Sequence, residues 1–458
     1  MKTLKTLLTF CGVFFGLYAA QSFAKEKPNI VLIMANDVSR DWISCYGAKH
    51  KTPNIDRLAS QGLRFNTAWS MPICTPTRVT LLTGQYPFHH GWTKHYDVPR
   101  WGGEGLSSKK FTTFARVLRD AGYATAIGGK WQINNLREQP DALFKHGFDE
   151  HCVWTGMEAG HPETGERYFN GHLLTNGKRS TAKYGPDTIN AFLMNFIRRH
   201  KTKPFLVYYP MLLTHGPHGA TPANAARPPE SKHDLFAANV SYMDKLVGQL
   251  VQSIDALGLR KNTLIVFTTD NGSSVAGTIE LTVGKQAKSI SHIPEIKEYP
   301  KGKGRLTDVG VHVPLIVRAP FLVPEPGTYT RDLVDFTDFF PTFVELAGAE
   351  LPKDTEIDGQ SFVPSLRGEE DPFLKRNWIF AQVGGQRMIR DWNYLYYSDQ
   401  RLYGISFDPK QRADLLKVKH NDKIAPSAHS RLSTILSRFP KKDAAAPFAM
   451  YGKRHASE

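Results

Sequence analysis

The sequence predicts an α/β protein in which helices cover a large mixed, mostly parallel sheet, followed by a smaller antiparallel sheet. Apolar segments of strand length alternate with amphipathic segments of helix length through residues 25–355, the order that produces parallel sheets. After a change of composition at Leu351–Gly359, residues 356–458 contain short strand-like segments, which indicate a small antiparallel sheet and a tail. A chain of 458 residues is long enough for one large domain and one small one.

The elements are expected in the following order. The apolar run Ile30–Ala35 ends in polar residues, as a buried central strand does. We then expect a helix within 52–65, a helix and a strand within 111–130, a strand within 203–213, a long helix over 237–259, strands within 262–269 and 312–320, and three strand segments of the small sheet within 377–383, 387–398 and 402–407. Residues 284–303 are expected to form a long loop, and the tail from Lys441 to be loosely ordered.

Residues 1–24 have the pattern of a cleaved signal peptide. A basic start at Lys2 and Lys5 precedes an apolar run over 7–20, and residues 22–24, Ser-Phe-Ala, form a small-x-small cleavage site. The apolar run is shorter than the ~20 residues that cross a bilayer, which disfavours a membrane anchor. We therefore expect a secreted or periplasmic protein without a membrane span.

The chain is strongly basic. Its net charge is +15, and removal of the two lysines in residues 1–24 leaves +13. A positive charge of this size favours anionic partners. No stretch interleaves basic and aromatic residues as nucleic-acid-binding segments do, so nucleic acid is not expected as a partner. A sulfated or phosphorylated substrate is compatible with the charge, and so is a simple role in solubility.

Three cysteines follow residue 24, at positions 45, 74 and 152. An odd, low count in an exported protein argues against a disulfide framework and indicates one thiol with a special role, although a single bridge between Cys45 and Cys152 stays open. Cys74 begins the polar stretch CTPTR, which leads into a helix-like run. Such a stretch is a poor place to pack a side chain, so we expect Cys74 to be presented for chemistry.

Polar side chains follow two of the predicted strands. Asn36 and Asp37 come after the first strand, and Asp270 and Asn271 come after the strand within 262–269. Each has an ordinary explanation as a turn or cap residue, but the carboxyl ends of parallel strands meet at one edge of a sheet. Carboxylate and amide oxygens make a hard, all-oxygen site of the kind that Ca²⁺ or Mg²⁺ prefers.

Four basic or titratable residues are expected to stand around this oxygen-rich site: Arg78, Lys130, His215 and Lys303. Lys130 and His215 lie at or just beyond the ends of predicted strands, and all four side chains can face an anion. A divalent cation surrounded by several positive side chains suits a tetrahedral oxyanion as the ligand.

The stretch Cys74-Thr75-Pro76-Thr77-Arg78 resembles the C-x-P-x-R signature of the sulfatase family, with a threonine where serine is commoner. The resemblance covers nearly the whole chain after residue 24. It continues at LLTG after the signature and includes PNIVLIMAND, TPNIDRLASQGLRF, GKW, LTHGP, YMDKLVG, LIVFTTDNG, GKG before VPLIV, and LYGISFDPKQRADL. Each segment is weak evidence alone, but together and in this order they are specific. The chain is identified as similar to the type I, formylglycine-dependent sulfatases of the alkaline-phosphatase-like superfamily.

The resemblance implies that Cys74 is a precursor and not a thiol nucleophile. In this family a separate maturation enzyme reads C-x-P-x-R on the unfolded chain and oxidises the cysteine to formylglycine. One hydroxyl of the hydrated aldehyde then attacks sulfur, and loss of a proton from the other expels sulfate. The expected partners are therefore this maturation enzyme and a sulfated small molecule or oligosaccharide.

The resemblance also implies roles for the candidate residues. A calcium ion would be bound by Asn36, Asp37, residue 74, Asp270 and Asn271. Arg78 would hold the nucleophile and its neighbours in place, Lys130 and Lys303 would neutralise sulfate oxygens, and His215 would help to protonate the leaving oxygen.

Two positions depart from the family pattern. Asn36 stands where the family usually has an aspartate, which removes one negative charge beside the cation. Gln132 stands where the family usually has a histidine that contacts the formylglycine hydrate. Asparagine still offers an oxygen and glutamine still forms hydrogen bonds, and His218 or His312 is a candidate to replace the missing histidine.

The sequence thus predicts a secreted, calcium-dependent sulfatase, with residues 284–300 helping to form the substrate pocket. A phosphodiesterase or phosphonate hydrolase of the same superfamily is the alternative enzyme. A sulfated-glycan-binding protein with weak catalysis is the alternative from another class, and Asn36 and Gln132 are the observations that favour it.

Overall fold

The computed structural model describes residues 27–156, 167–281, 295–406, 408, 410–418 and 424–446. A ten-stranded sheet has the order β12-β2-β11-β8-β1-β7-β3-β4-β5-β6. Its strands are β1 (Asn29–Ala35), β2 (Leu63–Trp69), β3 (Ala124–Lys130), β4 (Glu150–Trp154), β5 (Phe169–Thr175), β6 (Lys178–Tyr184), β7 (Phe205–Pro210), β8 (Thr263–Thr269), β11 (His312–Arg318) and β12 (Thr328–Asp335). The neighbouring pairs β12–β2, β8–β1, β1–β7, β7–β3 and β3–β4 are parallel, so the predicted mostly parallel mixed sheet is confirmed.

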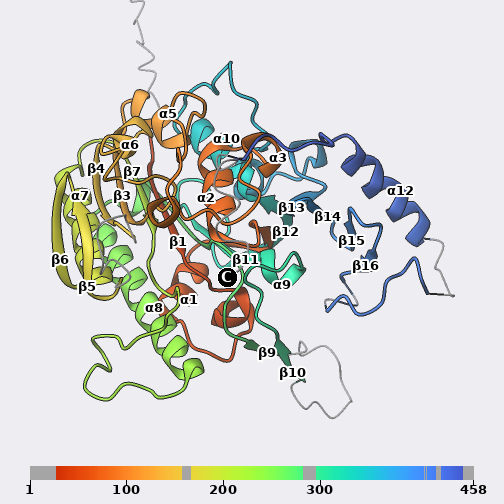
Figure 1. Cartoon of the computed structure of the whole chain (residues 1–458), viewed down its shortest axis with the longest axis horizontal. Helices are drawn as coiled ribbons and strands as arrows, with labels where there is room; N and C mark the ends of the chain where they lie inside the picture. Colours follow the sequence, from red (N-terminus) through yellow and green to blue (C-terminus); the bar gives the residue numbers. More distant parts are fainter. Residues whose placement is uncertain are drawn as a thin grey trace, which may run out of the picture.

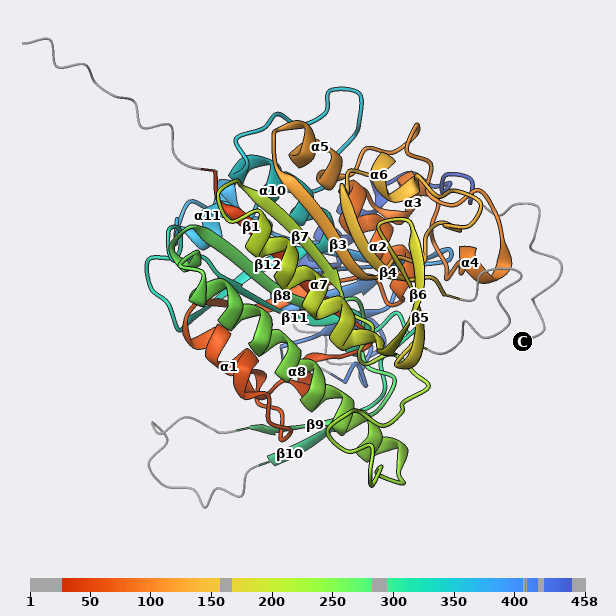
Figure 2. The same cartoon turned by 90° about the vertical axis from the view of Figure 1, so that its left-hand side faces the viewer.

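Helices cover both faces of this sheet (Figure 2). On one face lie α2 (Cys74–Thr83), α5 (Phe114–Asp120) and α10 (Phe339–Leu346), and on the other lie α1 (Pro53–Ser60), α7 (Gly185–Arg199) and α8 (Lys232–Ala256). Strand β1 shows why: Ile30, Leu32 and Met34 pack on the first face, while the residues between them pack on the second. A strand buried on both faces reads as a continuous apolar run, as expected for 30–35.

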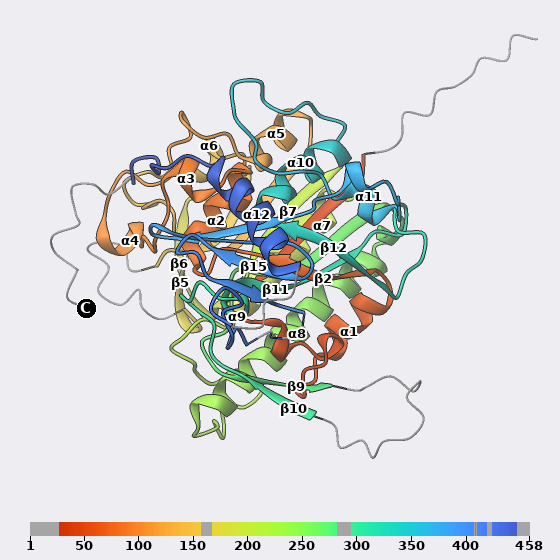
Figure 3. The same cartoon turned by 90° about the vertical axis from the view of Figure 1, so that its right-hand side faces the viewer.

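The small antiparallel sheet is also confirmed. It contains β13 (Ile379–Val383), β14 (Gln386–Arg390), β15 (Tyr394–Tyr397) and β16 (Leu402–Gly404) in chain order. Helix α12 (Ile424–Ser437), which the sequence did not predict, covers one face of it (Figure 3). On the other face, Phe380 and Met388 pack with Tyr86 and Phe88 of the large unit. The predicted boundary between residues 355 and 356 stays a prediction.

Short elements connect the main ones, as Figure 1 shows for several of them. The short helices are α3 (Pro87–His90), α4 (Val98–Trp101), α6 (Ala142–Lys145), α9 (Asp308–Val311) and α11 (Val363–Leu366), and the 3₁₀ turns are η1 (Arg40–Trp42), η2 (Ser44–Tyr46), η3 (Arg260–Asn262), η4 (Phe336–Asp338) and η5 (Pro372–Leu374). Strands β9 (Gly277–Leu281) and β10 (Glu295–Tyr299) form a separate antiparallel pair. The expected continuous loop over 284–303 is therefore wrong at 295–299, because these residues pair with β9.

Several other predictions are corrected or lie outside the described residues. Cys45 and Cys152 are both free, so the bridge left open by the sequence is absent. Residues 441–446 are held in place and not loose: Asp443 pairs with Arg387 at 2.6 Å, and Ala444 N donates to Phe88 O at 2.8 Å. The predicted signal peptide, residues 1–24, lies outside the described part of the chain. Within that part, no helix has the length and apolar character of a bilayer-crossing segment.

Candidate active site

Asp37 and Asp270 meet where strands β1 and β8 end. The two strands pair in parallel with Ala35 opposite Thr269, so the residues that follow them emerge side by side. Asp37 N donates to Asp270 Oδ1 at 3.0 Å, and Asn271 Nδ2 donates to Asp37 Oδ1 at 2.9 Å. All three residues are fully buried. The structure therefore brings together the oxygen-rich group that the sequence predicted at this edge.

The Asn36 amide can face this group with either of its two polar atoms. With the nitrogen toward the carboxylates it donates to Asp37 Oδ1 at 3.3 Å and Asp270 Oδ2 at 3.2 Å, and its oxygen accepts from Lys130 Nζ at 3.3 Å. With the oxygen toward the carboxylates, three oxygens face one another, an arrangement that a cation between them stabilises. Asn271 Oδ1 is also buried and accepts no hydrogen bond from the described residues. These oxygens fit a hard divalent cation.

Helix α2 brings Cys74 and Arg78 to the same edge of the sheet. Cys74 is the first residue of the helix, and Arg78 lies one turn later on the same face. Arg78 Nη2 pairs with Asp270 Oδ2 at 2.8 Å, and Nη1 donates to Lys130 O at 2.9 Å. The expectation that CTPTR packs poorly is wrong, because every residue of α2 is buried between the sheet and its neighbouring helices.

Lys130 and Gln132 lie at the end of β3. Gly129 has a φ of 129°, and a Cβ there would lie 1.9 Å from Pro210 O, so only glycine lets β3 approach β7 this closely. Lys130 is 2% exposed, and burial lowers the pKa of its ammonium group. Gln132 has a φ of 69°, an uncommon left-handed conformation for glutamine that functional sites often retain.

Cys74 Sγ lies between two polar side chains. It donates to Gln132 Oε1 at 3.4 Å, and His95 Nδ1 is 3.6 Å away. Burial acts to raise the pKa of the Cys74 thiol, but the nearby Lys130 and His95 outweigh burial and lower this pKa to about 6. His95 was missed by the sequence analysis. No local pattern distinguishes it from the other histidines, and only the fold places it beside residue 74.

Lys303 links the oxygen group to His215. Its Nζ donates to Asp37 Oδ2 at 2.5 Å and to His215 Nε2 at 3.0 Å. His215 Nδ1 donates to Gly216 O at 2.6 Å, and the Arg167 guanidinium lies against the same nitrogen. The imidazole is therefore neutral, with its bare Nε2 facing Lys303. Burial, followed by the charge of Lys130, lowers the pKa of His215 well below its ordinary value, which agrees with this protonation state.

The charges around Asp37 explain why it stays ionised in a buried position. Burial acts to raise the pKa of Asp37, but the charges of Lys303 and Lys130 hold it well below the ordinary range. Asp37 in turn raises the pKa of Lys303, against the opposing effect of burial. Asp37 and Lys303 therefore stabilise each other's charged forms.

A cavity of about 510 Å³ opens onto this site. Asp37, His215 and Lys303 line it, together with His218, which lies 3.4 Å from Ser274 Oγ. His218 is thus near the entrance and has no contact with Cys74. His312 lies elsewhere, hydrogen-bonded to Asn66 O and Asp308, so neither histidine that the sequence suggested occupies the position beside residue 74.

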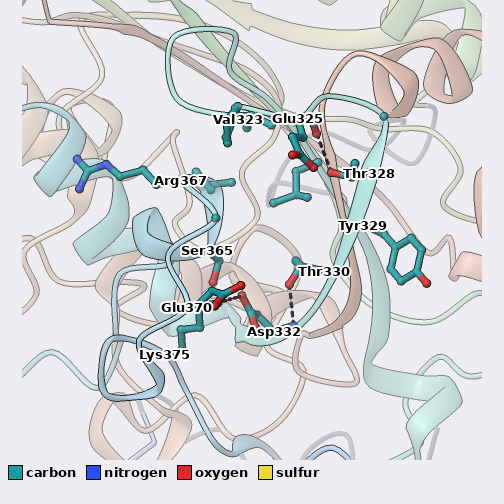
Figure 4. A pocket seen from close by; sticks show the side chains of 15 residues that line it. Val323, Glu325, Thr328, Tyr329, Thr330, Asp332, Ser365, Arg367, Glu370 and Lys375 are labelled. Carbon is teal, nitrogen blue, oxygen red and sulfur yellow. Dashed lines mark hydrogen bonds and ion pairs between the residues drawn. The ribbon is translucent and has the colours of Figure 1, made fainter.

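A larger cavity, of about 770 Å³, lies away from these residues along the edge strand β12 (Figure 4). Its lining mixes both charges: the acidic residues are Glu325, Asp332 and Glu370, and the basic ones are Arg367 and Lys375, which pairs with Asp332 at 3.0 Å. None of the candidate catalytic residues lines it. The cavity on β12 is therefore not the candidate active site.

Comparison with known families decides what this arrangement is. Residues 28–349 match the family model described as Sulfatase, and residues 303–437 match the model described as N-sulphoglucosamine sulphohydrolase, C-terminal. The first match spans well over half of the chain.

The chain belongs to the sulfatase family. It is 30% identical over 422 residues to steryl-sulfatase of Mus musculus, an alignment that covers 76% of this chain and 66% of that protein. It is 28% identical over 433 residues to N-acetylgalactosamine-6-sulfatase of Canis lupus familiaris, covering 86% of this chain and 77% of that one. This sulfatase is accordingly a sulfuric ester hydrolase by class.

Two solved structures of Ps i-CgsB have the same fold. The crystal structure of Ps i-CgsB is 26% identical to this sulfatase and superposes with a TM-score of 0.71, covering 90% of this chain and 92% of that one. The structure of Ps i-CgsB in complex with k-i-k-neocarrahexaose has a TM-score of 0.72 at 24% identity and covers 94% of this chain and 98% of that one. The predicted alkaline-phosphatase-like fold is confirmed.

The thiol environment predicts the pH dependence of alkylation in sulfatase that retains Cys74 as cysteine. Because Lys130 and His95 lower the thiol pKa to about 6, iodoacetamide should modify Cys74 with a pH midpoint near that value. Burial raises the pKa of Cys45 to about 12 and of Cys152 to about 11, so these two cysteines should react little below pH 9. Peptide mass spectrometry in the presence of a chelator measures all three. A Cys74 midpoint near ~8.5, the ordinary thiol value, would contradict the electrostatic account.

Proposed function

We propose that this protein is an exported sulfatase that hydrolyses sulfate esters of a carbohydrate, with a bound calcium ion and a formylglycine made from Cys74. The observation that carries the proposal is the position of Cys74: it lies beside a buried oxygen group and within a ring of positive side chains. Such a ring attracts a doubly charged oxyanion, and the oxygens attract a divalent cation.

A sulfated carbohydrate is the proposed substrate class. One curated relative is named for the 6-sulfate of N-acetylgalactosamine, and one structural relative was solved with k-i-k-neocarrahexaose. The net charge of +15 supports an anionic, multiply sulfated substrate. The signal-peptide pattern of residues 1–24 supports export, so the proposed location is the periplasm or the outside of the cell.

The proposed calcium site consists of Asn36, Asp37, Asp270 and Asn271, completed by residue 74. Calcium accepts this oxygen-only set, and magnesium is the second choice. A cation bound there polarises the sulfate group and orients it toward residue 74. Asn36 contributes its amide oxygen, so the amide must be oriented with its oxygen, and not its nitrogen, toward the Asp37 and Asp270 carboxylates.

The chain's own side chains would orient and neutralise the sulfate. A formylglycine at position 74 would supply a hydrated aldehyde as the nucleophile. Lys130 and Lys303 are both close enough to lower the pKa of the Cys74 thiol, and each would hold sulfate oxygens, while Arg78 fixes the helix that carries residue 74. Because Nε2 of His215 accepts a hydrogen bond from Lys303, we infer that Lys303 would donate the proton to the leaving oxygen and that His215 would orient its ammonium group.

His95 is proposed to take the place of the histidine that Gln132 replaces. Gln132 accepts a hydrogen bond from residue 74 but cannot exchange a proton near neutral pH. His95 Nδ1 lies 3.6 Å from Cys74 Sγ, and its ring packs edge-on against Trp101 with the centroids 5.3 Å apart. A histidine in this position can act as the base that residue 74 needs.

The main experiment uses protein from a host that has the maturation enzyme. Mass spectrometry of the peptide spanning residue 74 is expected to show the aldehyde, and that preparation is expected to release sulfate from sulfated sugars and leave matched phosphate esters largely intact. The Cys74→Ala variant is the control for both measurements. Cysteine without aldehyde, while a control sulfatase in the same host is converted, would overturn the formylglycine assignment. Preferred cleavage of phosphodiesters or phosphonates, or glycan binding without sulfate release, would favour one of the two alternatives.

The cation site predicts the effect of Asn36→Asp. An added carboxylate beside a divalent cation should tighten calcium binding by about 1 kcal/mol or more, roughly fivefold, in a partly dehydrated site. Calorimetric titration with calcium and the calcium-dependent rise in melting temperature both measure this. Asn195→Asp, which adds the same charge on the exposed surface of α7, should have little effect. Unchanged or weaker calcium binding in Asn36→Asp would exclude Asn36 as a ligand.

The His95 assignment predicts a rescue. His95→Asn should lower kcat on a sulfate ester by ~10- to 100-fold, since losing a positioned base typically costs this much or more. Adding Gln132→His to that variant should restore part of the loss and shift the pH profile. His218→Asn, at the entrance of the cleft, is the matched control and should cost less. An unchanged rate in His95→Asn would show that His95 has no part in turnover.

A further inference from the structure

A third cavity, of about 380 Å³, lies where the ten-stranded sheet meets the small sheet. The residues that matter most in it come from separate parts of the chain: Arg40 from η1, His312 from β11, Arg331 from β12, Arg390 from β14, and Trp392 from the turn after β14. The mechanism above uses none of them. Two of the segments that line the cavity follow candidate active-site residues closely in the sequence: Arg40 comes shortly after Asp37, and α9 comes shortly after Lys303.

The floor of this cavity is a buried network around one carboxylate. Asp308 Oδ1 pairs with Arg390 Nη1 at 3.1 Å and accepts from Trp69 Nε1 at 3.3 Å, and Asp308 Oδ2 lies 3.1 Å from His312 Nδ1. His312 Nε2 donates to Asn66 O at 2.8 Å. Asp308 is thus hydrogen-bonded within the protein. The charge of Arg40 also helps to lower the pKa of Asp308, but Asp308 forms no ion pair with Arg40 or Arg331.

Arg40 and Arg331 are the unpaired cations of the cavity. Neither forms an ion pair or a side-chain hydrogen bond with any residue in the described ranges, although Arg40 is half-buried. Arg40 lies close enough to the floor to act on it: after burial, its charge contributes most to the lowering of the pKa of His312. With three arginines against one aspartate, the cavity carries an excess of positive charge that an anion would balance.

Trp392 adds an apolar surface beside these cations. Its side chain is 44% exposed, and its Nε1 donates to Arg331 O at 3.0 Å, which holds the indole next to the arginine. A fixed, exposed indole offers a flat face for the C–H groups of a sugar ring, while the neighbouring guanidinium groups offer paired donors for an oxyanion. The combination suits a sugar that carries a negatively charged group.

We propose that this cavity is a second binding site for a sulfated sugar unit, separate from the reaction centre. The assignment of a sulfated sugar as the ligand rests on the proposed function. Arg40 and Arg331 bind the sulfate group, Trp392 packs against the ring, and the Asp308–Arg390 pair forms the floor. A polymeric substrate would then be held at two points of the same molecule, which raises the effective concentration of its sulfate groups near the active site.

The test measures binding by the full chain with Cys74→Ala, so that no turnover interferes. The probe is a sulfated dextran hexasaccharide, with unsulfated dextran of the same length for comparison, and the measurement is calorimetry. Arg331→Ala and Arg40→Ala should each weaken binding about tenfold, the effect of losing one charge-assisted hydrogen bond. Arg260→Ala removes the same charge from an exposed site in η3 and should change affinity less than twofold. Because Arg331 is exposed and unpaired, the melting temperature of the Arg331→Ala variant should match that of the parent protein.

A second measurement locates the ligand. Binding of the sulfated hexasaccharide should change the tryptophan emission of the parent protein, and Trp392→Phe should remove most of that change. Equal weakening by Arg260→Ala and Arg331→Ala, or an unaltered emission change in Trp392→Phe, would overturn the proposal. Equally tight binding of a single-stranded DNA of the same charge would show a general polyanion site and overturn the assignment to a sugar. None of these results requires sulfatase activity, so they stand apart from the test of the proposed function.

Discussion

The buried ion pair between Arg78 and Asp270 is the interaction on which the site depends. Asp270 follows β8, Arg78 belongs to α2, and the second Arg78 donor binds the Lys130 carbonyl at the end of β3. One guanidinium thus fixes the helix that carries Cys74 to two strands of the sheet. A buried charge that loses its partner costs several kcal/mol. The ion pair therefore opposes any shift of α2 relative to β3 and β8. The planar guanidinium makes both contacts at once, which a lysine could not do.

The balance of charge around Asp37 follows from this arrangement. A buried carboxylate beside two lysines stays ionised, and the neighbouring imidazole stays neutral. Asn36 changes that balance, since its amide can satisfy the carboxylates with its nitrogen or serve a cation with its oxygen. The substitution therefore lowers the negative charge of the site without leaving a buried group unpaired. Gln132 stands where the family usually has a histidine and accepts a hydrogen bond from Cys74, and His95 Nδ1 lies 3.6 Å from the same sulfur.

Much of the fold could be predicted because its signals are local. The apolar run 30–35 and the alternation of strand-length with helix-length segments each reflect a pattern that can be read along the chain. The elements that were missed depend on distant partners. Residues 295–299 form a strand only because β9 lies beside them, and residues 441–446 are ordered by Arg387 and Phe88. Helix α12 needs the small sheet to bury its apolar face.

For the site, the sequence by itself determined which residues follow strand ends and which family pattern they resemble. It therefore placed Asp37, Asp270, Asn271 and Lys130 at one edge, because parallel strands end together. Only the tertiary structure decided the contacts between segments: His95 beside Cys74, Lys303 between Asp37 and His215, and the arginines at the junction of the two sheets. These residues are tens to hundreds of positions apart, and no local periodicity or propensity encodes such distances. Packing of the whole chain around one buried sheet brings them within bonding range.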